Sequence, residues 1–340
     1  ERVYENNCMF GIVKTAHESK LGDVQRMSYQ MVNCLDESIM ENVVKESVEY
    51  VETLKQNDDE FLKFLEKNKN FSNDYEVLIA LCEQNRDFLR SSYFRRRKRK
   101  IIESMKGGLI VSCQVQHDDP IYTDDMVIKM AEAAKWAGAV GIRANSPEQI
   151  KAIKKAVPDL PMIGLWKVWY EDTDVFITPT IKEAKAVFEA GAEIIALDCT
   201  SQINHDGTPA WELIKKVKQE IPEAIIFADV SNLEEAHHAV ENGADIVAPT
   251  LYGYTKETAN IEGPDYRMFA RMCRELGDQA YVMMEGHLYT PEDAMKCIFL
   301  GAHSVVVGSA ITRPHLTAKR FVDLLSGYQN NWRDAGKAKH

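Results

Sequence analysis

From Gly107 onward, short apolar runs alternate regularly with helix-like segments, and this alternation is the strongest constraint on the fold. Eight runs have the composition of strands: "LIVSCQ", "VGIRA", "MIGLWK", "IIALDC", "IIFADV", "DIVAPT", "YVMMEG" and "SVVVGS". Helix-like segments lie between them, such as "TIKEAKAVFEAG" and "NLEEAHHAVENG", which close on Gly191 and Gly243. A glycine in that place can end a helix. Strands that alternate with helices indicate βαβ units and a parallel sheet.

The number of units decides between two kinds of parallel sheet. The strands are near-continuously apolar, as strands covered on both faces are. Eight βα units in about 220 residues fit a (β/α)8 TIM barrel. An open doubly wound sheet is the alternative, but no GxGxxG motif follows the first strand and the units continue to eight. We therefore expect the barrel over residues 105–328, followed by a polar tail over residues 329–340.

The preceding region, residues 1–104, has a different composition. Its first hundred residues contain glycine only at Gly11 and Gly22 and no proline. Stretches such as "ESIMENVVKESVEYVETLK" place apolar residues at intervals of three and four, as helices do. We expect an α-helical region of unknown role that ends in the basic run "RRRKRK" at 95–100. This run is a solvated helix end in the plainest interpretation, and a site for an anion or nucleic acid in the alternative.

Composition also restricts the functional class. No apolar run is long enough to cross a bilayer, and no signal peptide is visible. The seven cysteines are scattered without a CxxC pair, which favours a reducing compartment over a disulfide framework or a zinc site. A net charge of −11 disfavours nucleic acid as a bulk partner. We expect a cytoplasmic protein that binds neither nucleic acid nor membrane.

Polar residues stand at the carboxyl ends of the expected strands, where barrels of this class build their active sites. In chain order they are Gln114, Arg143, Lys167, Asp198, Asp229, Thr250, Glu285 and the pair Gly308–Ser309. Each one alone could be a polar residue leaving the sheet. Together they place two cations, three carboxylates and an amide around one barrel mouth. The ligand that binds at this mouth should be polar and anionic.

The last two units indicate a phosphate site. "EGHLYTP" and "VGSAITRP" supply small residues and free main-chain N–H groups where barrels commonly bind phosphate. In these segments Gly286, Gly308 and Ser309 are the candidate turn residues, and Arg313 is close enough to add charge-assisted hydrogen bonds. Ordinary strand-to-helix turns are the alternative explanation for the glycines.

The sequence does not predict a metal site. His117, His205 and His287 fall in loops after strands, but no HxH or HxxxH pair is present. None of the eight strand ends is a histidine, whereas catalytic transition metals commonly use such ligands. We expect neither a metal nor an organic cofactor.

Lys167 and Glu285 are the candidate proton-transfer groups. Burial beside another cation such as Arg143 would lower the pKa of Lys167 toward neutrality and make its amine a base. Glu285 could lie across the mouth as a second acid or base. A lysine and a glutamate around a bound sugar phosphate suit proton abstraction next to a carbonyl, and Schiff-base formation is the other use of such a lysine.

These motifs together resemble one family, the N-acetylmannosamine-6-phosphate 2-epimerases of bacterial sialic acid catabolism. The resemblance runs from about residue 106 to residue 325. Its markers are "GGLIVSCQ" (107–114), "GIRANS" (141–146), "IGLWK" (163–167), "ALDCT" (196–200), "HDG" (205–207), "FADVS" (227–231), "EGPD" (262–265), "MEGH" (284–287) and "VVGSAITRP" (306–314). It implies a barrel of the ribulose-phosphate-binding type that interconverts N-acetylmannosamine 6-phosphate and N-acetylglucosamine 6-phosphate without a metal.

Carried over by motif, the resemblance implies roles for individual residues. Lys167 and Glu285 would handle protons. Sugar binding or positioning would fall to Gln114, Arg143, Asp229 and Arg313, with Gly286, Gly308 and Ser309 in the turns that face the substrate. Many family members have a second lysine where this chain has Val168, and the loop that follows carries the aromatic residues Trp169 and Tyr170.

Two other functions stay open at this point. Another phosphate-binding barrel isomerase is one, and a sugar-phosphate-sensing regulator that uses the helical region to bind a partner is the other. For the enzyme we expect a phosphorylated N-acetylhexosamine as substrate and a homo-oligomer, a dimer, as the assembly. The resemblance does not extend to residues 1–100.

Overall fold

The computed structural model describes residues 94–95, 97–115, 118–123, 125–259 and 263–337. Most of the expected helical region 1–104 lies outside these residues, although residues 97–103 are helical. The chain divides into two compact units, Glu1–Lys100 and Ile101–His340. The second unit contains all the strands of the described part of the chain.

This unit alternates strands and helices as the sequence predicts. The strands are β1 (Leu109–Cys113), β2 (Gly141–Asn145), β3 (Met162–Leu165), β4 (Ile194–Asp198), β5 (Ile225–Asp229), β6 (Ile246–Ala248), β7 (Tyr281–Val282), β8 (Met284–Glu285) and β9 (Val305–Val307). The helices are α6 (Met126–Trp136), α7 (Pro147–Ala156), α8 (Ile181–Glu189), α9 (Leu213–Glu220), α10 (Leu233–Glu241), α11 (Tyr266–Leu276), α12 (Pro291–Phe299), α13 (Ser309–Thr312) and α14 (Pro314–Lys337), with a 3-10 turn η2 (Ala210–Glu212) before α9.

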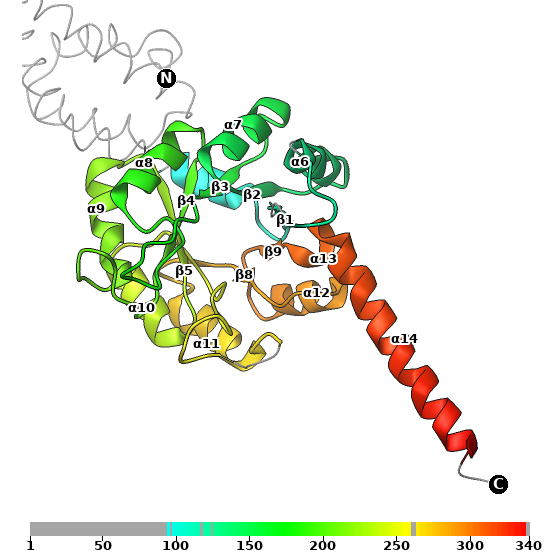
Figure 1. Ribbon diagram of the computed structural model, residues 1–340. Coiled ribbons are helices and arrows are strands. Elements are labelled where there is room, and N and C mark those ends of the chain that lie inside the picture. Colours follow the sequence, from blue (N-terminus) through cyan, green and yellow to red (C-terminus); the bar gives the residue numbers. More distant parts are fainter. Residues whose placement is uncertain (1–93, 96, 116–117, 124, 260–262, 338–340) are drawn as a thin grey trace, which may run out of the picture. The chain divides into compact units, whose positions relative to one another are not determined.

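The strands form one parallel barrel. Their order is β7-β6-β5-β4-β3-β2-β1-β9-β8, and every pairing between them is parallel. β7 and β8 are two halves of the seventh expected strand, separated by Met283. β7 bonds to β6 and β8 bonds to β9, so this strand joins the two ends of the sheet. Nine short strands therefore fill the eight positions of a (β/α)8 barrel, with helices around them (Figure 1).

Local signals in the sequence explain where the helices begin and end. The side chains of Thr180, Asn232 and Thr290 accept main-chain N–H bonds at the starts of α8, α10 and α12, as N-cap residues do. Gly191 and Gly243 follow α8 and α10 with φ angles of 107° and 100°, which a glycine adopts without strain. The expected helix-ending role of these two glycines is confirmed.

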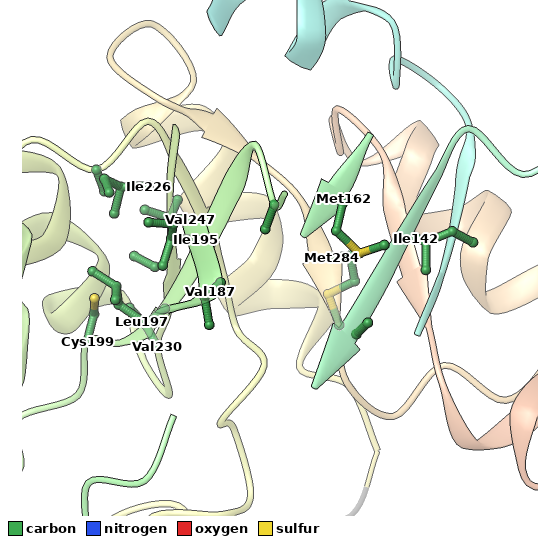
Figure 2. Packing of buried hydrophobic residues seen from close by; sticks show 14 of the residues in the cluster. Ile142, Met162, Val187, Ile195, Leu197, Cys199, Ile226, Val230, Val247 and Met284 are labelled. Carbon is green, nitrogen blue, oxygen red and sulfur yellow. The ribbon is translucent and has the colours of Figure 1, made fainter. Parts of the chain in front are cut away.

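One layer of the core lies between the strands and the helices. It contains the outward-facing strand residues, such as Ile142, Ile195 and Ile226, packed with helix residues such as Val187 (Figure 2). The helices thus cover the outward face of the strands.

A second layer fills the inside of the barrel. Its inward-facing strand residues are Ile110, Ile163, Leu165, Ile194, Ala196, Ile225, Phe227, Ile246, Ala248 and Val306, and Met283 between β7 and β8 belongs to the same layer. Ile102 and Met105, from the segment before β1, belong to the same cluster and are 2% and 0% exposed. His303, ahead of β9, bonds through its ring to the main-chain oxygen of Ile102 at 2.8 Å. The segment before β1 therefore closes the amino end of the barrel.

The last described residues form the long helix α14. Residues 329–337 of the expected polar tail are part of this helix. Its described surface includes four exposed large apolar side chains, Phe321, Val322, Leu324 and Leu325. None of the helices within the described residues combines the length and the apolar character needed to cross a bilayer.

Candidate active site

The alternation of side chains along each strand places the candidate site residues inside the barrel. Residues two apart on a strand face the same side. Ile225 and Phe227 lie in the inner layer, and Asp229 is the next inward residue of β5. By the same rule Leu165 is followed by Lys167, and Met283 by Glu285. The polar groups therefore form the layer directly above the apolar filling of the barrel.

Arg143 is the centre of this layer. Its guanidinium donates two hydrogen bonds to Asp229, from Nη1 to Oδ1 at 3.0 Å and from Nη2 to Oδ2 at 2.7 Å. Nη1 also donates to Oε2 of Glu285 at 2.6 Å. The side chains of Arg143, Asp229 and Glu285 are 1%, 0% and 12% exposed. Burial opposes the charge of Arg143, but the two carboxylates outweigh it and raise its pKa. This residue stays a cation.

Lys167 lies just after β3, half-buried at the mouth. Its main-chain N–H donates to Oδ1 of Asn145 at 2.9 Å, and it pairs with Ile177 in an isolated antiparallel bridge. Burial lowers the pKa of its ammonium group, and the charge of Arg143 lowers it further. Glu285 and Asp229 oppose this shift without reversing it. The predicted direction of the shift is confirmed, with burial as the larger cause.

Glu285 has the opposite shift. Burial raises its pKa to about 7, and the charge of Asp229 adds to the effect, whereas Arg143 and Lys167 lower it. A buried carboxyl group that is part protonated at neutral pH can act as either an acid or a base. The pKa of Lys167 is therefore lowered and that of Glu285 is raised, so the two values lie closer together than those of an ordinary lysine and glutamate.

Gly286 allows the chain to turn directly after Glu285. Its φ is 104°, and a side chain there would meet the main-chain oxygen of Pro249 at 3.4 Å. His287 follows with a φ of 55°, and its Nε2 bonds to the main-chain oxygen of Tyr252 at 2.9 Å. The turn after β8 is thus anchored to the loop after β6.

Gln114, Gly308 and Ser309 lie at the β1 and β9 side of the mouth. The side-chain amide of Gln114 donates to the hydroxyl of Ser112 at 2.9 Å. A Cβ on Gly308 would approach the Cβ of Ser112 at 3.4 Å, so the two strands are in close contact here. Ser309 is exposed and begins α13. These residues leave an open polar edge on that side of the mouth.

Arg313 is held by a carboxylate from the loop after β1. Its Nε and Nη2 donate to the two oxygens of Asp119 at 3.1 Å and 2.6 Å. His315 lies 3.2 Å from the same carboxylate. The charge of Arg313 acts on Lys167, whose pKa it lowers. The structure therefore brings Arg313 to the same mouth as the other candidate residues.

Comparison with known proteins adds an independent observation. A sequence profile described as "Putative N-acetylmannosamine-6-phosphate epimerase" matches residues 127–326. This chain belongs to that epimerase family. The resemblance predicted from the strand-end motifs is confirmed.

Relatives in this epimerase family match about two thirds of this chain and nearly all of their own length. A "Putative N-acetylmannosamine-6-phosphate 2-epimerase" of Caldanaerobacter subterraneus subsp. tengcongensis is 43% identical over 225 residues, which are 66% of this chain and 94% of the relative. A protein of the same name from Clostridioides difficile is 45% identical over 222 residues, 65% of this chain and 97% of the relative. The solved structure of the N-acetylmannosamine-6-phosphate 2-epimerase from Clostridium perfringens matches with a TM-score of 0.62 and 37% identity, covering 66% and 96%.

Two residues of this epimerase-family site were missed by reasoning from the sequence. Asn145, which accepts the N–H of Lys167, is two residues after Arg143 on β2, so the period-two alternation was a usable signal for it. Asp119 lies in an irregular loop with no such pattern, and nothing local to it predicts that it binds Arg313.

The loop after β3 forms a short hairpin beside the mouth. The main-chain N–H of Val168 donates to the oxygen of Phe176 at 3.0 Å, and the rings of Trp169 and Phe176 stack 5.7 Å apart. The hydroxyl of Tyr170 donates to Glu183 of α8 at 3.2 Å. Trp169 therefore packs within this loop, and Tyr170 bonds to the nearest helix.

Of the three loop histidines noted in the sequence, His117 lies outside the described residues. His205 bonds to Asp172 at 2.6 Å with both side chains 54% exposed, and its ring stacks on Tyr170. His287 bonds to a main-chain oxygen. Across the described ranges, no group of three or more His, Cys, Asp or Glu side chains is placed to hold a metal ion.

Proposed function

We propose that this chain is an N-acetylmannosamine-6-phosphate 2-epimerase, an isomerase of amino sugar catabolism that interconverts N-acetylmannosamine 6-phosphate and N-acetylglucosamine 6-phosphate. The observation that carries the proposal is that two titratable groups with shifted pKa values lie at one barrel mouth. The pKa of Lys167 is lowered and that of Glu285 is raised. Family membership supplies the substrate, because the relatives are named for it.

The proposed reaction begins with the open-chain sugar, in which C2 lies next to the C1 aldehyde. Neutral Lys167 removes the C2 proton, and the C–H electron pair moves toward the carbonyl oxygen to give an enolate. Donors fixed in the mouth stabilise the negative charge on that oxygen. Return of a proton to the opposite face of C2 inverts the centre. Glu285, part protonated at neutral pH, is the second acid–base group.

Other residues of the mouth bind and position the substrate in this proposal. Gly308, Ser309 and Arg313 lie on the side that suits the phosphate, where α13 begins and the guanidinium held by Asp119 adds a positive charge. Gln114 and the Arg143–Asp229 pair face the sugar, and Gly286 leaves room beside Glu285. The proposed route uses the chain's own acid–base groups, with neither a metal nor an organic cofactor.

We further propose that the enzyme is a cytoplasmic homodimer that binds neither nucleic acid nor membrane. The exposed apolar side chains of α14 support self-association, because a symmetric dimer can bury the same patch of both copies. The scattered free cysteines, buried at Cys113, Cys199 and Cys297, suit a reducing compartment.

The experiment that tests the function is conversion of N-acetylmannosamine 6-phosphate by the purified chain, followed by proton NMR. We expect N-acetylglucosamine 6-phosphate to accumulate, and a chelator to leave the rate unchanged. Unphosphorylated N-acetylmannosamine is the matched control, and it should react far more slowly because the phosphate contacts are missing. Equal rates for the two sugars, or no conversion of either, would reject the proposal.

A further inference from the structure

Asp198 is a buried carboxyl group at the end of β4 that has no role in the proposed reaction. It is the register partner of Asp229, the last residue of β5. Its side chain faces inward, because Ile194 and Ala196 of the same strand belong to the inner layer. Asp198 is 2% exposed and Asp229 is 0% exposed. Two carboxyl groups therefore lie on neighbouring strands whose backbones are about 4.8 Å apart.

These two carboxyl groups have different partners. Asp229 is matched by the guanidinium of Arg143, which donates to both of its oxygens. Oδ1 of Asp198 accepts from the main-chain N–H of Thr200 at 3.1 Å and from the Thr200 hydroxyl at 2.7 Å. Oδ2 of Asp198 is buried and has no hydrogen-bond partner in the described part of the chain.

An ionised Asp198 would be unfavourable in this position. A buried charge is tolerated when a counter-charge and hydrogen bonds compensate it. The neighbouring strand β5 instead offers Asp198 the carboxylate of Asp229, and the charge of Glu235 adds to the repulsion. Protonation removes the charge and turns Oδ2 into an O–H group, while Oδ1 still accepts from Thr200. Burial raises the pKa of Asp198 to about 7, although the Thr200 hydrogen bonds lower it.

We propose that Asp198 is a positioning residue that acts in its protonated form, so that of the two register-paired aspartates only Asp229 carries a charge during turnover. The functional part of this inference rests on the proposed epimerase activity. An ionised Asp198 would put a second negative charge beside Asp229, which must stay ionised to pair with Arg143.

The charge state can be measured without any substrate. The protein is labelled with 13C at the aspartate carboxyl carbons, and its NMR spectrum is followed as a function of pH. We expect one aspartate resonance with a midpoint near pH 7 that is absent from Asp198→Asn. Asp229→Asn should keep this resonance with its midpoint at lower pH, because the charge of Asp229 raises the pKa of Asp198. If the resonance that Asp198→Asn removes has a midpoint below about pH 5, as an ordinary aspartate does, the inference is wrong.

A second variant keeps the test valid should Asp198→Asn fail to fold. Thr200→Val removes the hydroxyl donor and leaves Asp198 in place. Because that hydrogen bond favours the ionised carboxylate, its loss should move the midpoint of the same resonance to higher pH. A midpoint that does not move, or moves to lower pH, would contradict the proposed environment.

Kinetics then test the positioning role with a matched pair of variants. Asp198→Asn keeps a neutral hydrogen-bonding group, so its loss in kcat/KM should be roughly tenfold or less. Asp229→Asn makes the same change at the register partner, removes the charge that pairs with Arg143 and should lose roughly 10²-fold or more. Asp198→Asn should also retain activity to higher pH than the wild type. Equal losses in the two variants, or an unchanged alkaline limb in Asp198→Asn, would overturn the inference.

The two proposals can fail separately. A wild-type chain that does not epimerise N-acetylmannosamine 6-phosphate, but still shows the Asp198 resonance near pH 7, would reject the function and keep the charge assignment. An active chain whose Asp198 titrates below about pH 5 would keep the function and reject the positioning role.

Discussion

At the scale of single residues, the proposed reactivity of Lys167 comes from its surroundings. Burial and the neighbouring Arg143 lower its pKa, so more of its amine is neutral at a given pH than in an exposed lysine. Lys167→Met keeps most of the side-chain volume and removes the ionisable nitrogen. We expect kcat to fall roughly 10²- to 10⁴-fold, because a base acting in the transition state contributes about that much. Substrate affinity should fall only modestly, since Arg313 and the Gly308 turn remain.

Steady-state kinetics and thermal unfolding check this prediction, with Lys215→Met on the exposed face of α9 as the control. The control should match the wild type in both. If the kcat of Lys167→Met stays within about tenfold of the wild type, Lys167 is a polar residue of the mouth and not the base.

Glu285 should make stability depend on pH. Its pKa is raised from 4.5 to about 7 in the folded chain, so the folded state binds this proton more tightly than the unfolded state. The resulting stabilisation is complete below about pH 4.5 and is lost as the pH rises through about 7. The free energy of unfolding of the wild type, relative to Glu285→Gln, should therefore fall between pH 5 and pH 8. Urea titrations of both proteins at the two pH values measure it, and a constant difference would contradict the raised pKa.

Which residues face the mouth was largely predictable from the sequence, because strand alternation and strand ends follow local patterns. The bonds between these residues were not. Arg143 and Asp229 are 86 positions apart, and Arg313 and Asp119 are 194 apart. Such pairs depend on side-chain rotamers and on the curvature of the closed barrel, which no local pattern records. Arg143, expected at a strand end, is the third residue of β2 and reaches the mouth through its long side chain.

At the scale of elements, the segment before β1 is part of the barrel. Ile102 is 2% exposed in the inner layer, and Tyr281 of β7 donates from its hydroxyl to Glu103 at 3.0 Å. Ile102→Ala should destabilise the chain by about 2–5 kcal/mol, the usual cost of such a truncation in a core. Lys106→Ala, at an exposed position of the same segment, should change little. Chemical denaturation of both variants checks this, and equal stabilities would show that the segment does not seal the barrel.

The same observation sharpens the domain boundary predicted from the sequence, which the change in glycine and proline content placed at residue 104. The compact unit begins at Ile101. Composition marks where the pattern of strands begins, but it cannot show that a helical residue such as Ile102 packs beneath them. A chain that starts at residue 97 should therefore fold and epimerise, whereas one that starts at residue 107 should be unstable. Solubility and activity of the two truncated chains decide this.

At the scale of the whole molecule, α14 is the candidate contact between two copies. Leu324 and Leu325 are 77% and 62% exposed, which is costly for side chains of this size unless a partner covers them. Replacing both with glutamate should convert the proposed dimer to a monomer, because burying two charges in an apolar contact is unfavourable. Ala318→Glu, at another exposed position of α14, is the control. Analytical ultracentrifugation measures the assembly, and a wild-type chain that sediments as a monomer would contradict the proposed dimer.

The most direct test of the central claim, acid–base inversion at C2 by Lys167, is turnover of N-acetylmannosamine 6-phosphate in deuterated water. Proton NMR of the N-acetylglucosamine 6-phosphate formed reports the isotope at C2. Because the proposed route removes the C2 proton and returns one from groups that exchange with solvent, we expect deuterium at C2 with the wild type and no deuterium uptake with Lys167→Met. A wild-type product that retains its original C2 hydrogen, or a Lys167→Met protein that still exchanges it, would contradict the account.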